Sequence, residues 1–142
     1  MKKVNQFVLL MGAGALLVTM SFGTANAQDK PKGKEWKVAD ADAKKKSPVK
    51  SDDEATLKAG KDIWSAQCKS CHGAKGLGDG TKAETIDISC GDFSSNDVQS
   101  LSDGALYWKI TEGRKPMPSF KEKLSDTERW QVAAYIRTLK KK

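Results

Sequence analysis

The chain has 142 residues, of which 25 are Lys or Arg and 18 are Asp or Glu, and its formal net charge is +7 at pH 7. This length allows one ordinary domain, so any function must be carried by a single small core. Charges of both signs are interspersed along the chain, which argues against nucleic acid as a partner and leaves only a preference for acidic protein surfaces.

Residues 1–27 have the pattern of an export signal. Two lysines near the start precede an uncharged apolar run from Phe7 to Met20, and small residues follow at Ala25 and Ala27. The run is short for spanning a bilayer, so we expect cleavage after Ala27 and a periplasmic or otherwise exported protein without a membrane span. An uncleaved membrane anchor is the alternative. Both interpretations place the rest of the chain outside the cytoplasm.

Residues 28–50 have the composition of a tail or linker. They contain eight lysines, two prolines and a single large aromatic residue, Trp36. Such a segment cannot bury enough apolar surface to fold alone. Trp36 either docks on the neighbouring domain or stays exposed, and the sequence leaves both placements open.

We expect residues 51–142 to form the folded domain. Its first predicted helix starts at a capping box. In the Ser-x-x-Glu pattern of Ser51 and Glu54, each side chain accepts a hydrogen bond from a backbone amide that the first turn leaves unpaired. Behind it an apolar stripe at helical spacing runs as far as Cys68. Because Gly60 in this stripe is costly for helix formation, we expect another backbone to approach closely there.

Two further helices are predicted after a glycine-rich loop. One starts at Ser102 or Asp103 and stops at Gly113. The last starts at a second capping box, Ser125 with Glu128, and has one apolar side. This part of the sequence contains no convincing alternating strand pattern. The fold class is therefore predicted to be all-α, with three to five helices and long loops that need something to pack around.

The stretch CKSCH, residues 68–72, concentrates the reactive side chains. The thiols of Cys68 and Cys71 lie at i and i+3, and His72 lies at i+4, so all three can face one flat object. Haem is such an object, because two thiols can alkylate its vinyl groups as thioethers while the imidazole ligates the iron. The spacing is a strong signal for covalently attached haem c.

A second axial ligand follows from the composition. His72 is the only histidine, and three of the four methionines lie in the signal segment, which leaves Met117. Pro116 and Pro118 restrict the backbone on both sides of Met117, so the loop can hold a weak ligand in place. Filling a gap in the core is the alternative role for this methionine.

With these motifs the sequence resembles the class I monohaem c-type cytochromes in their exported bacterial form. The resemblance covers residues 51–142 and rests on GKDIWSAQCKSCHG, GRKPMPSF and RWQVAAYIRTL. It implies helices and loops wrapped around one haem c, attached through Cys68 and Cys71, with His72 and Met117 as axial ligands of the iron. It also implies that the first and last helices cross, with Gly60, Ile63 and Trp64 meeting Val132, Tyr135 and Ile136.

These features predict a one-electron shuttle in a respiratory or other periplasmic redox chain, and not an enzyme. We expect a monomer that meets redox partner proteins at the exposed haem edge. Lys69, Lys75 and Lys115 are close to that edge in the sequence and would favour acidic docking surfaces, although charged residues are often only a solvated face. If Met117 is labile, the protein would instead bind small ligands or act as a weak peroxidase.

Other interpretations of the cysteines stay open. Cys90 has no place in the family pattern and can be a free buried thiol, an intermolecular disulfide partner or a stray ligand, of which we favour the first. Together with Cys68, Cys71 and His72 it gives the ligand count of a structural zinc site, although the adjacent Cys71 and His72 diverge. A disulfide oxidoreductase through Cys68 and Cys71 is disfavoured, because the motif closes a helix and no strand precedes it.

The surroundings of the haem are predicted less specifically. Tyr107, Trp108 and Arg114 are candidates for the pocket wall or for contacts with the haem propionates, with core packing as the alternative for the two aromatic residues. The glycines of residues 73–80 do not form a dinucleotide or phosphate loop, since no strand precedes them. We expect them to let the backbone pass tightly along the haem rim.

Overall fold

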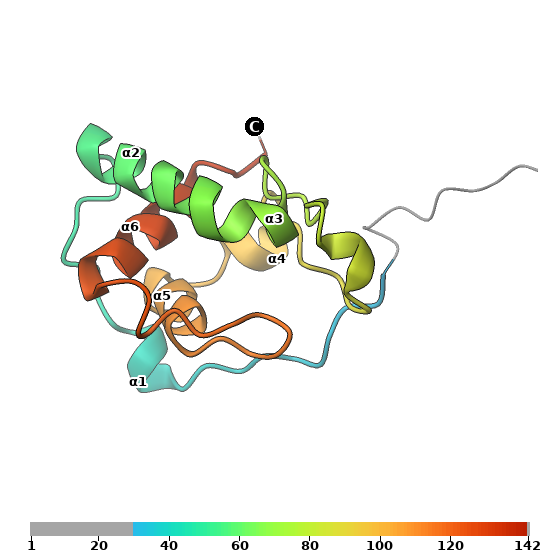
Figure 1. The fold of residues 1–142 in the computed structure, drawn as a ribbon. Coiled ribbons are helices and arrows are strands. Elements are labelled where there is room, and N and C mark those ends of the chain that lie inside the picture. The colour runs from blue at the N-terminus through green and yellow to red at the C-terminus, as the bar shows by residue number, and fades with distance from the viewer. Residues whose placement is uncertain (1–29, 142) are drawn as a thin grey trace, which may run out of the picture.

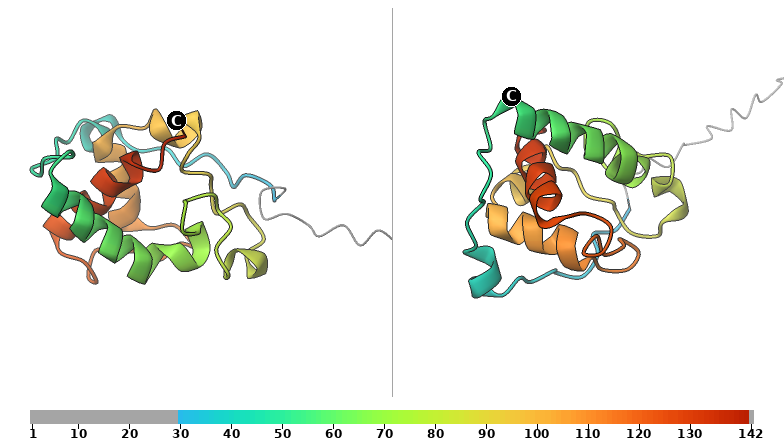
Figure 2. Two further views of the ribbon diagram at one scale, coloured as in Figure 1. Left: turned by 90° about the horizontal axis from the view of Figure 1, so that it is seen from above. Right: turned by 60° about the vertical axis from the view of Figure 1, so that its left-hand side comes forward.

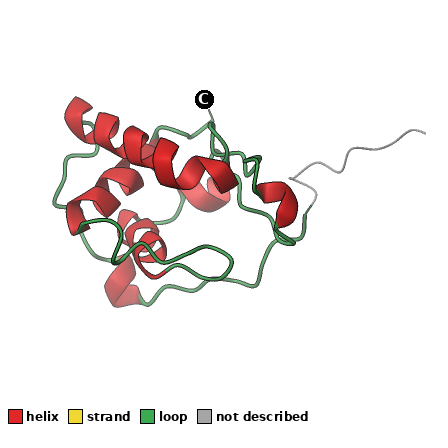
Figure 3. Ribbon diagram, viewed as in Figure 1, coloured by secondary structure: helices red, strands yellow, loops and turns green. Residues whose placement is uncertain are grey.

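The computed structural model describes residues 30–141, and the expected signal segment with its cleavage site lies outside the described residues. Regular structure in residues 30–141 is helical, apart from one isolated bridge between Arg114 and Met117 (Figure 3). The all-α prediction is confirmed. None of the helices in this part of the chain has the length and apolarity needed to cross a bilayer.

A long helical rod leads into the CKSCH motif. It consists of α2 (Glu54–Ile63), a π-helical segment η2 (Trp64–Cys68) and α3 (Lys69–His72) (Figure 1). The π-helical segment was not expected from the sequence. Its wider turn ends at Cys68, the first residue of the motif, and such turns are frequent at functional sites.

The predicted capping box of Ser51 and Glu54 is wrong. The residue that caps α2 is Asp53, whose side chain accepts a hydrogen bond from the Thr56 amide at 2.8 Å. Residues 51 and 52 form an exposed turn before the helix. The carboxylate of Asp53 satisfies an unpaired amide and also places a negative charge at the positive end of the helix dipole.

Helix α5 (Asp103–Glu112) has the boundaries that the sequence predicts. The Ser102 side chain accepts a hydrogen bond from the Ala105 amide at 3.1 Å. At the other end Gly113 has a φ of +64°, a left-handed conformation that favours glycine. Short helices η3 (Ala83–Thr85) and α4 (Asn96–Gln99) interrupt the long loop before α5.

Helix α6 (Asp126–Arg137) begins with the predicted capping box of Ser125 and Glu128, which is confirmed. It crosses α2 in the middle of the molecule (Figure 2). A Cβ atom on Gly60 would overlap with the carbonyl oxygen of Gln131 and lie 2.9 Å from Cβ of Tyr135. The expectation of a close backbone approach at Gly60 is therefore confirmed.

Residues 30–47 lie against the rest of the domain. An extended stretch runs along its lower side in Figure 1 to α1 (Asp40–Ala43), which packs against α5. The Ser102 hydroxyl donates a hydrogen bond to the Ala43 carbonyl at 2.5 Å. The sequence left two placements open for Trp36, and in the structure it is docked on the domain. The centroids of the Trp36 and Trp108 rings are 6.3 Å apart.

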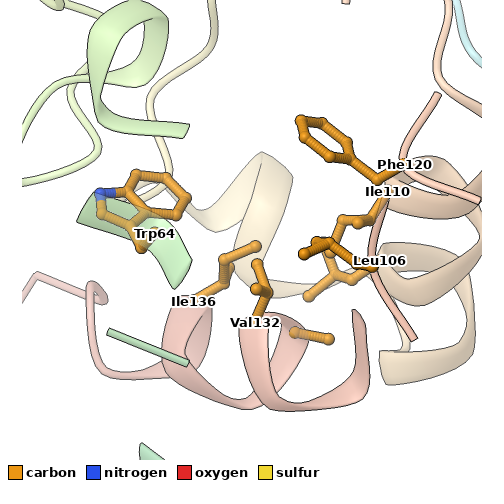
Figure 4. Close-up of a cluster of buried hydrophobic side chains, with 8 residues drawn as sticks. Trp64, Leu106, Ile110, Phe120, Val132 and Ile136 are labelled. Carbon is orange, nitrogen blue, oxygen red and sulfur yellow. The ribbon is translucent and has the colours of Figure 1, made fainter. Parts of the chain in front are cut away.

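The core joins the helical rod to α5, α6 and the loop between them (Figure 4). Trp64 and Val132 are its largest fully buried side chains. The buried cluster consists of Trp64, Leu106, Ile110, Phe120, Leu124, Val132, Ala133 and Ile136. Ile63 and Tyr135 pack against this cluster, as the resemblance implies.

Candidate haem site

The four predicted haem residues line one cavity of about 250 Å³. Cys68, Cys71 and His72 reach it from the end of the helical rod, and Met117 reaches it from the loop between α5 and α6. Residues separated by 45 positions in the sequence thus meet at the same space. This convergence is what a haem held from both sides requires.

The walls of the cavity are mainly apolar. Figure 4 shows Trp64 on one side and Leu106, Ile110 and Phe120 on the other, with Val132 and Ile136 of α6 between them. All of these side chains are buried and line the cavity. An apolar enclosure of this kind fits the faces of a porphyrin ring and keeps water away from them.

His72 is oriented for ligation by its second ring nitrogen. Its Nδ1 lies 2.6 Å from the carbonyl oxygen of Cys90, so Nδ1–H donates to this carbonyl and Nε2 is left with a free lone pair. Phe93 contacts the ring edge-on at 4.8 Å between ring centroids, and Trp64 lies 5.8 Å away. Burial lowers the pKa of His72, which keeps the imidazole in the neutral form that binds metal.

The thiols of Cys68, Cys71 and Cys90 are all free. Burial, with a smaller contribution from Cys71, raises the pKa of Cys68 to about 12. A disulfide oxidoreductase needs a thiolate with a lowered pKa, so this environment argues against that interpretation. Free, half-buried thiols beside an apolar cavity fit attachment to a haem instead.

The glycine-rich loop closes over the end of α3. The amides of Gly78 and Gly80 donate to the carbonyls of His72 and Cys71 at 2.9 and 3.2 Å, so carbonyls that the helix end leaves free are satisfied. A Cβ atom on Gly78 would lie 2.8 Å from the Gly91 carbonyl oxygen. The close approaches at these two glycines are thus to backbone of the motif helix and of the loop that carries Cys90.

Met117 is fixed by its own loop. Its amide donates to the Arg114 carbonyl at 2.8 Å, and the Arg114 amide donates back to the Met117 carbonyl at 3.0 Å. The side chain is half-buried and packs against the apolar core cluster. The loop between the two prolines therefore places Met117 at the wall of the cavity.

The zinc interpretation does not fit the structure. No group of three or more Cys, His, Asp or Glu side chains in residues 30–141 is arranged to hold a metal ion. Nδ1 of His72 donates a hydrogen bond to the backbone carbonyl of Cys90. This nitrogen is therefore not available to bind a metal ion together with the Cys90 thiol. Cys68, Cys71, His72 and Cys90 therefore do not form a Cys3His centre.

Two of the three predicted wall residues belong to other parts of the molecule. Tyr107 stacks on Trp130 with 4.1 Å between ring centroids and donates a hydrogen bond to Asp126. Trp108 packs on Trp36, and neither Tyr107 nor Trp108 lines the cavity. Core packing was the alternative for both, and it is found for Tyr107, whereas Trp108 is half-buried beneath Trp36 and lies outside the core cluster. Arg114 does line the cavity.

Other residues of the site were missed. The Cys90 carbonyl and Phe93 orient His72, and Trp36 and Lys109 also line the cavity. Phe93 is the only aromatic residue between His72 and Tyr107, which is a usable signal in the sequence. A backbone carbonyl leaves no such signal, because any residue supplies one.

The donor set fits haem c. Two free thiols are three positions apart, an imidazole has its Nδ1 already bound, and a thioether reaches the same apolar cavity. These are the groups that attach and ligate a c-type haem.

A sequence model of the family described as cytochrome c oxidase, cbb3-type, subunit III matches residues 55–136, more than half of the chain. The chain belongs to this family of c-type cytochromes. Its cofactor is accordingly an iron-containing haem c that is bound covalently. The resemblance noted in the sequence is confirmed.

Similarity to known proteins agrees with this assignment. Over 82 residues the chain is 34% identical to cytochrome c6 of Synechocystis sp. (strain ATCC 27184 / PCC 6803 / Kazusa), which covers 58% of this chain and 64% of that protein. The chain thus spans less than two thirds of this relative's length.

Two solved structures are also similar. The KustC0563 c-type cytochrome has a TM-score of 0.52 and 30% identity, covering 58% of this chain and 98% of that one. A chain of the Kuenenia stuttgartiensis reducing HAO-like protein complex Kustc0457/Kustc0458 has a TM-score of 0.58 and 32% identity. That match covers 66% of this chain and 47% of the other.

Proposed function

We propose that this cytochrome is a one-electron carrier with a His72- and Met117-ligated haem, attached through Cys68 and Cys71. The observation that carries the proposal is the convergence of these four side chains on one apolar cavity. When bound, the haem supplies a one-electron iron couple. Two protein ligands leave no open position for a substrate, so we expect a shuttle and not an enzyme.

The chain's own residues would tune this couple. The Cys90 carbonyl holds the Nδ1 proton of His72, which fixes the ring and makes Nε2 a better donor. Methionine ligation and an apolar wall both favour the less charged reduced state, which raises the reduction potential. The side chains that exclude water also keep the site from reorganising during electron transfer.

We further propose that the protein is exported and works as a monomer with redox partner proteins. The signal pattern of residues 1–27 supports export. Lys69, Lys75 and Lys115 are exposed, and they would steer acidic partners toward the haem edge at rates that fall with increasing salt.

The test is a visible spectrum of protein made in an exporting host that attaches haem, recorded native and in alkaline pyridine, beside the Met117→Ala variant. We expect haem that stays with the denatured chain and a near-red sulfur-to-iron band in the oxidised protein that the variant lacks. A colourless product would refute the proposal. Red protein without the band would refute Met117 ligation and favour a haem that binds small ligands.

A further inference from the structure

A strap, residues 30–46, runs along the domain from the loop after the motif to α1, which packs against α5 (Figure 1). At its start the Lys30 ammonium donates hydrogen bonds of 2.6 to 2.8 Å to the carbonyls of Ala83, Glu84 and Ile86. At its end Ala43 accepts the hydrogen bond from Ser102 at the start of α5. The strap therefore joins the loop after the motif to the opposite wall of the cavity.

Trp36 is the strap residue that reaches the cavity. Two cations lie against its ring: the Arg114 guanidinium is 4.7 Å and the Lys109 ammonium 5.1 Å from the ring centroid. The Arg114 guanidinium also donates to the strap carbonyls of Lys34 and Glu35 at 2.8 and 3.2 Å. These contacts fix the direction of both cations.

Neither cation has an acidic partner in residues 30–141. The ion pairs found there involve other residues, and both Lys109 and Arg114 are half-buried and line the cavity. Burial, together with the charge of Arg114, lowers the pKa of Lys109. Two neighbouring positive charges beside an apolar cavity are unfavourable unless something negative enters it.

A c-type haem brings two such charges. The thiols of Cys68 and Cys71 would form thioethers with its two vinyl groups. Its remaining substituents include two propionate carboxylates. We propose that Lys109 and Arg114 pair with these propionates and that Trp36 positions both cations, so that the strap completes the haem site. The proposal rests on the haem-carrying function above.

The pairing predicts an effect on the haem's redox equilibrium. A positive charge near the haem favours the reduced state, so removing one should shift the equilibrium toward the oxidised state, by about three- to tenfold at this depth. Because the two cations are half-buried, added salt should screen this shift only weakly. An exposed cation should have a smaller effect that salt removes.

The experiment is a redox titration of the haem-loaded protein at low and high salt. Lys109→Gln and Arg114→Gln are compared with Lys115→Gln. Lys115 is an exposed cation next to Arg114 that does not line the cavity. We expect the threefold or larger shift for the first two at both salt concentrations, with the Met117 band retained. Equal shifts in all three variants, or shifts that vanish at high salt, would overturn the pairing.

The positioning role of Trp36 needs its own pair of variants. Trp36→Phe keeps an aromatic face for the cations, whereas Trp36→Leu keeps apolar bulk without one. We expect the Leu variant to shift the redox equilibrium of the haem by most of the amount that Lys109→Gln does. The Phe variant should retain the redox equilibrium of the unmutated protein. Identical behaviour of the two variants would limit Trp36 to packing.

A crystal structure of the haem-loaded protein tests the geometry directly. Propionate oxygens within hydrogen-bond distance of Lys109 and Arg114 are expected, and propionates directed elsewhere would overturn the proposal. The proposed function fails separately, through loss of the covalent haem or of the near-red band. A protein with both features but without the Lys109 and Arg114 shifts would keep its function and refute only this inference.

Discussion

Cys90 lines the cavity and contacts His72 through its backbone carbonyl. Its carbonyl accepts the hydrogen bond from His72 at 2.6 Å, while its thiol is free and half-buried. The sequence offered only roles for the thiol, because that is the part of a cysteine that differs from other residues. The distinction is testable, since a substitution removes the thiol and keeps the carbonyl.

We expect Cys90→Ala to retain the covalent haem, the near-red band and the redox equilibrium of the unmutated protein. Cys71→Ala is the contrasting variant, because it removes one thioether and should shift the alkaline pyridine spectrum to the red. Both are read from the same spectra. Loss of haem or of the band in Cys90→Ala would show that the thiol itself acts on the iron.

At the scale of elements, the helix caps show that a sequence motif can predict a helix start and still misidentify the capping residue. Of the two Ser-x-x-Glu patterns that predict helix starts, at Ser51 and at Ser125, only the one at Ser125 forms a capping box. At the other position the residue that caps the helix is Asp53, two residues beyond Ser51. Both residues are preferred caps, so local propensity does not choose between them.

Asp53→Ala should therefore lower the melting temperature, whereas Ser51→Ala should leave it unchanged. Hydrogen bonds from Thr56 lower the pKa of Asp53 below its ordinary value of 3.8. The carboxylate thus binds protons more weakly in the folded state, so its stabilisation is present above pH 3.8 and is lost as the pH falls through the lowered folded pKa.

The measurement is thermal unfolding of both variants between pH 2 and pH 7. Asp53→Asn is the control, because its amide oxygen still caps the helix but does not titrate. A larger loss of stability for Ser51→Ala than for Asp53→Ala would contradict the assignment of the cap.

The crossing of α2 and α6 sets a second limit at this scale. A Cβ on Gly60 meets the Gln131 carbonyl, which belongs to a helix backbone and cannot rotate away. Gly60→Ala gains roughly 1 kcal/mol of helix propensity, but overpacking of this kind typically costs about 1–3 kcal/mol. We expect a net loss of stability in chemical denaturation. Lys61→Ala, an exposed neighbour, should change little, and a stabilised Gly60→Ala variant would show that the helices can separate without cost.

At the scale of the whole molecule, the cavity interrupts a core that is already small. Apolar side chains from the rod, from α5 and from α6 line it (Figure 4). A chain of this size buries too little apolar surface to tolerate such a gap when it has no cofactor. A ligand that binds only the folded state adds its binding energy to stability.

The Cys68→Ala/Cys71→Ala variant, made without haem, should therefore lack a cooperative thermal transition. Circular dichroism of the variant and of the haem-loaded protein measures this directly. A cooperative transition with native helix content in the haem-free chain would contradict the expectation and show that protein contacts alone stabilise the fold.

The sequence by itself determined the features that depend on local spacing. Neighbouring residues define the i, i+3, i+4 arrangement in CKSCH, the position of Met117 between two prolines, and the caps of α5 and α6. Together with the single histidine, these features allowed haem attachment and an all-α fold to be predicted. Tertiary structure decided what depends on residues far apart. The carbonyl of Cys90 meets His72, and Trp36 crosses to Lys109 and Arg114, only after the chain has folded. Such contacts involve backbone atoms and ordinary lysines, whose identity carries no signal until packing brings them together.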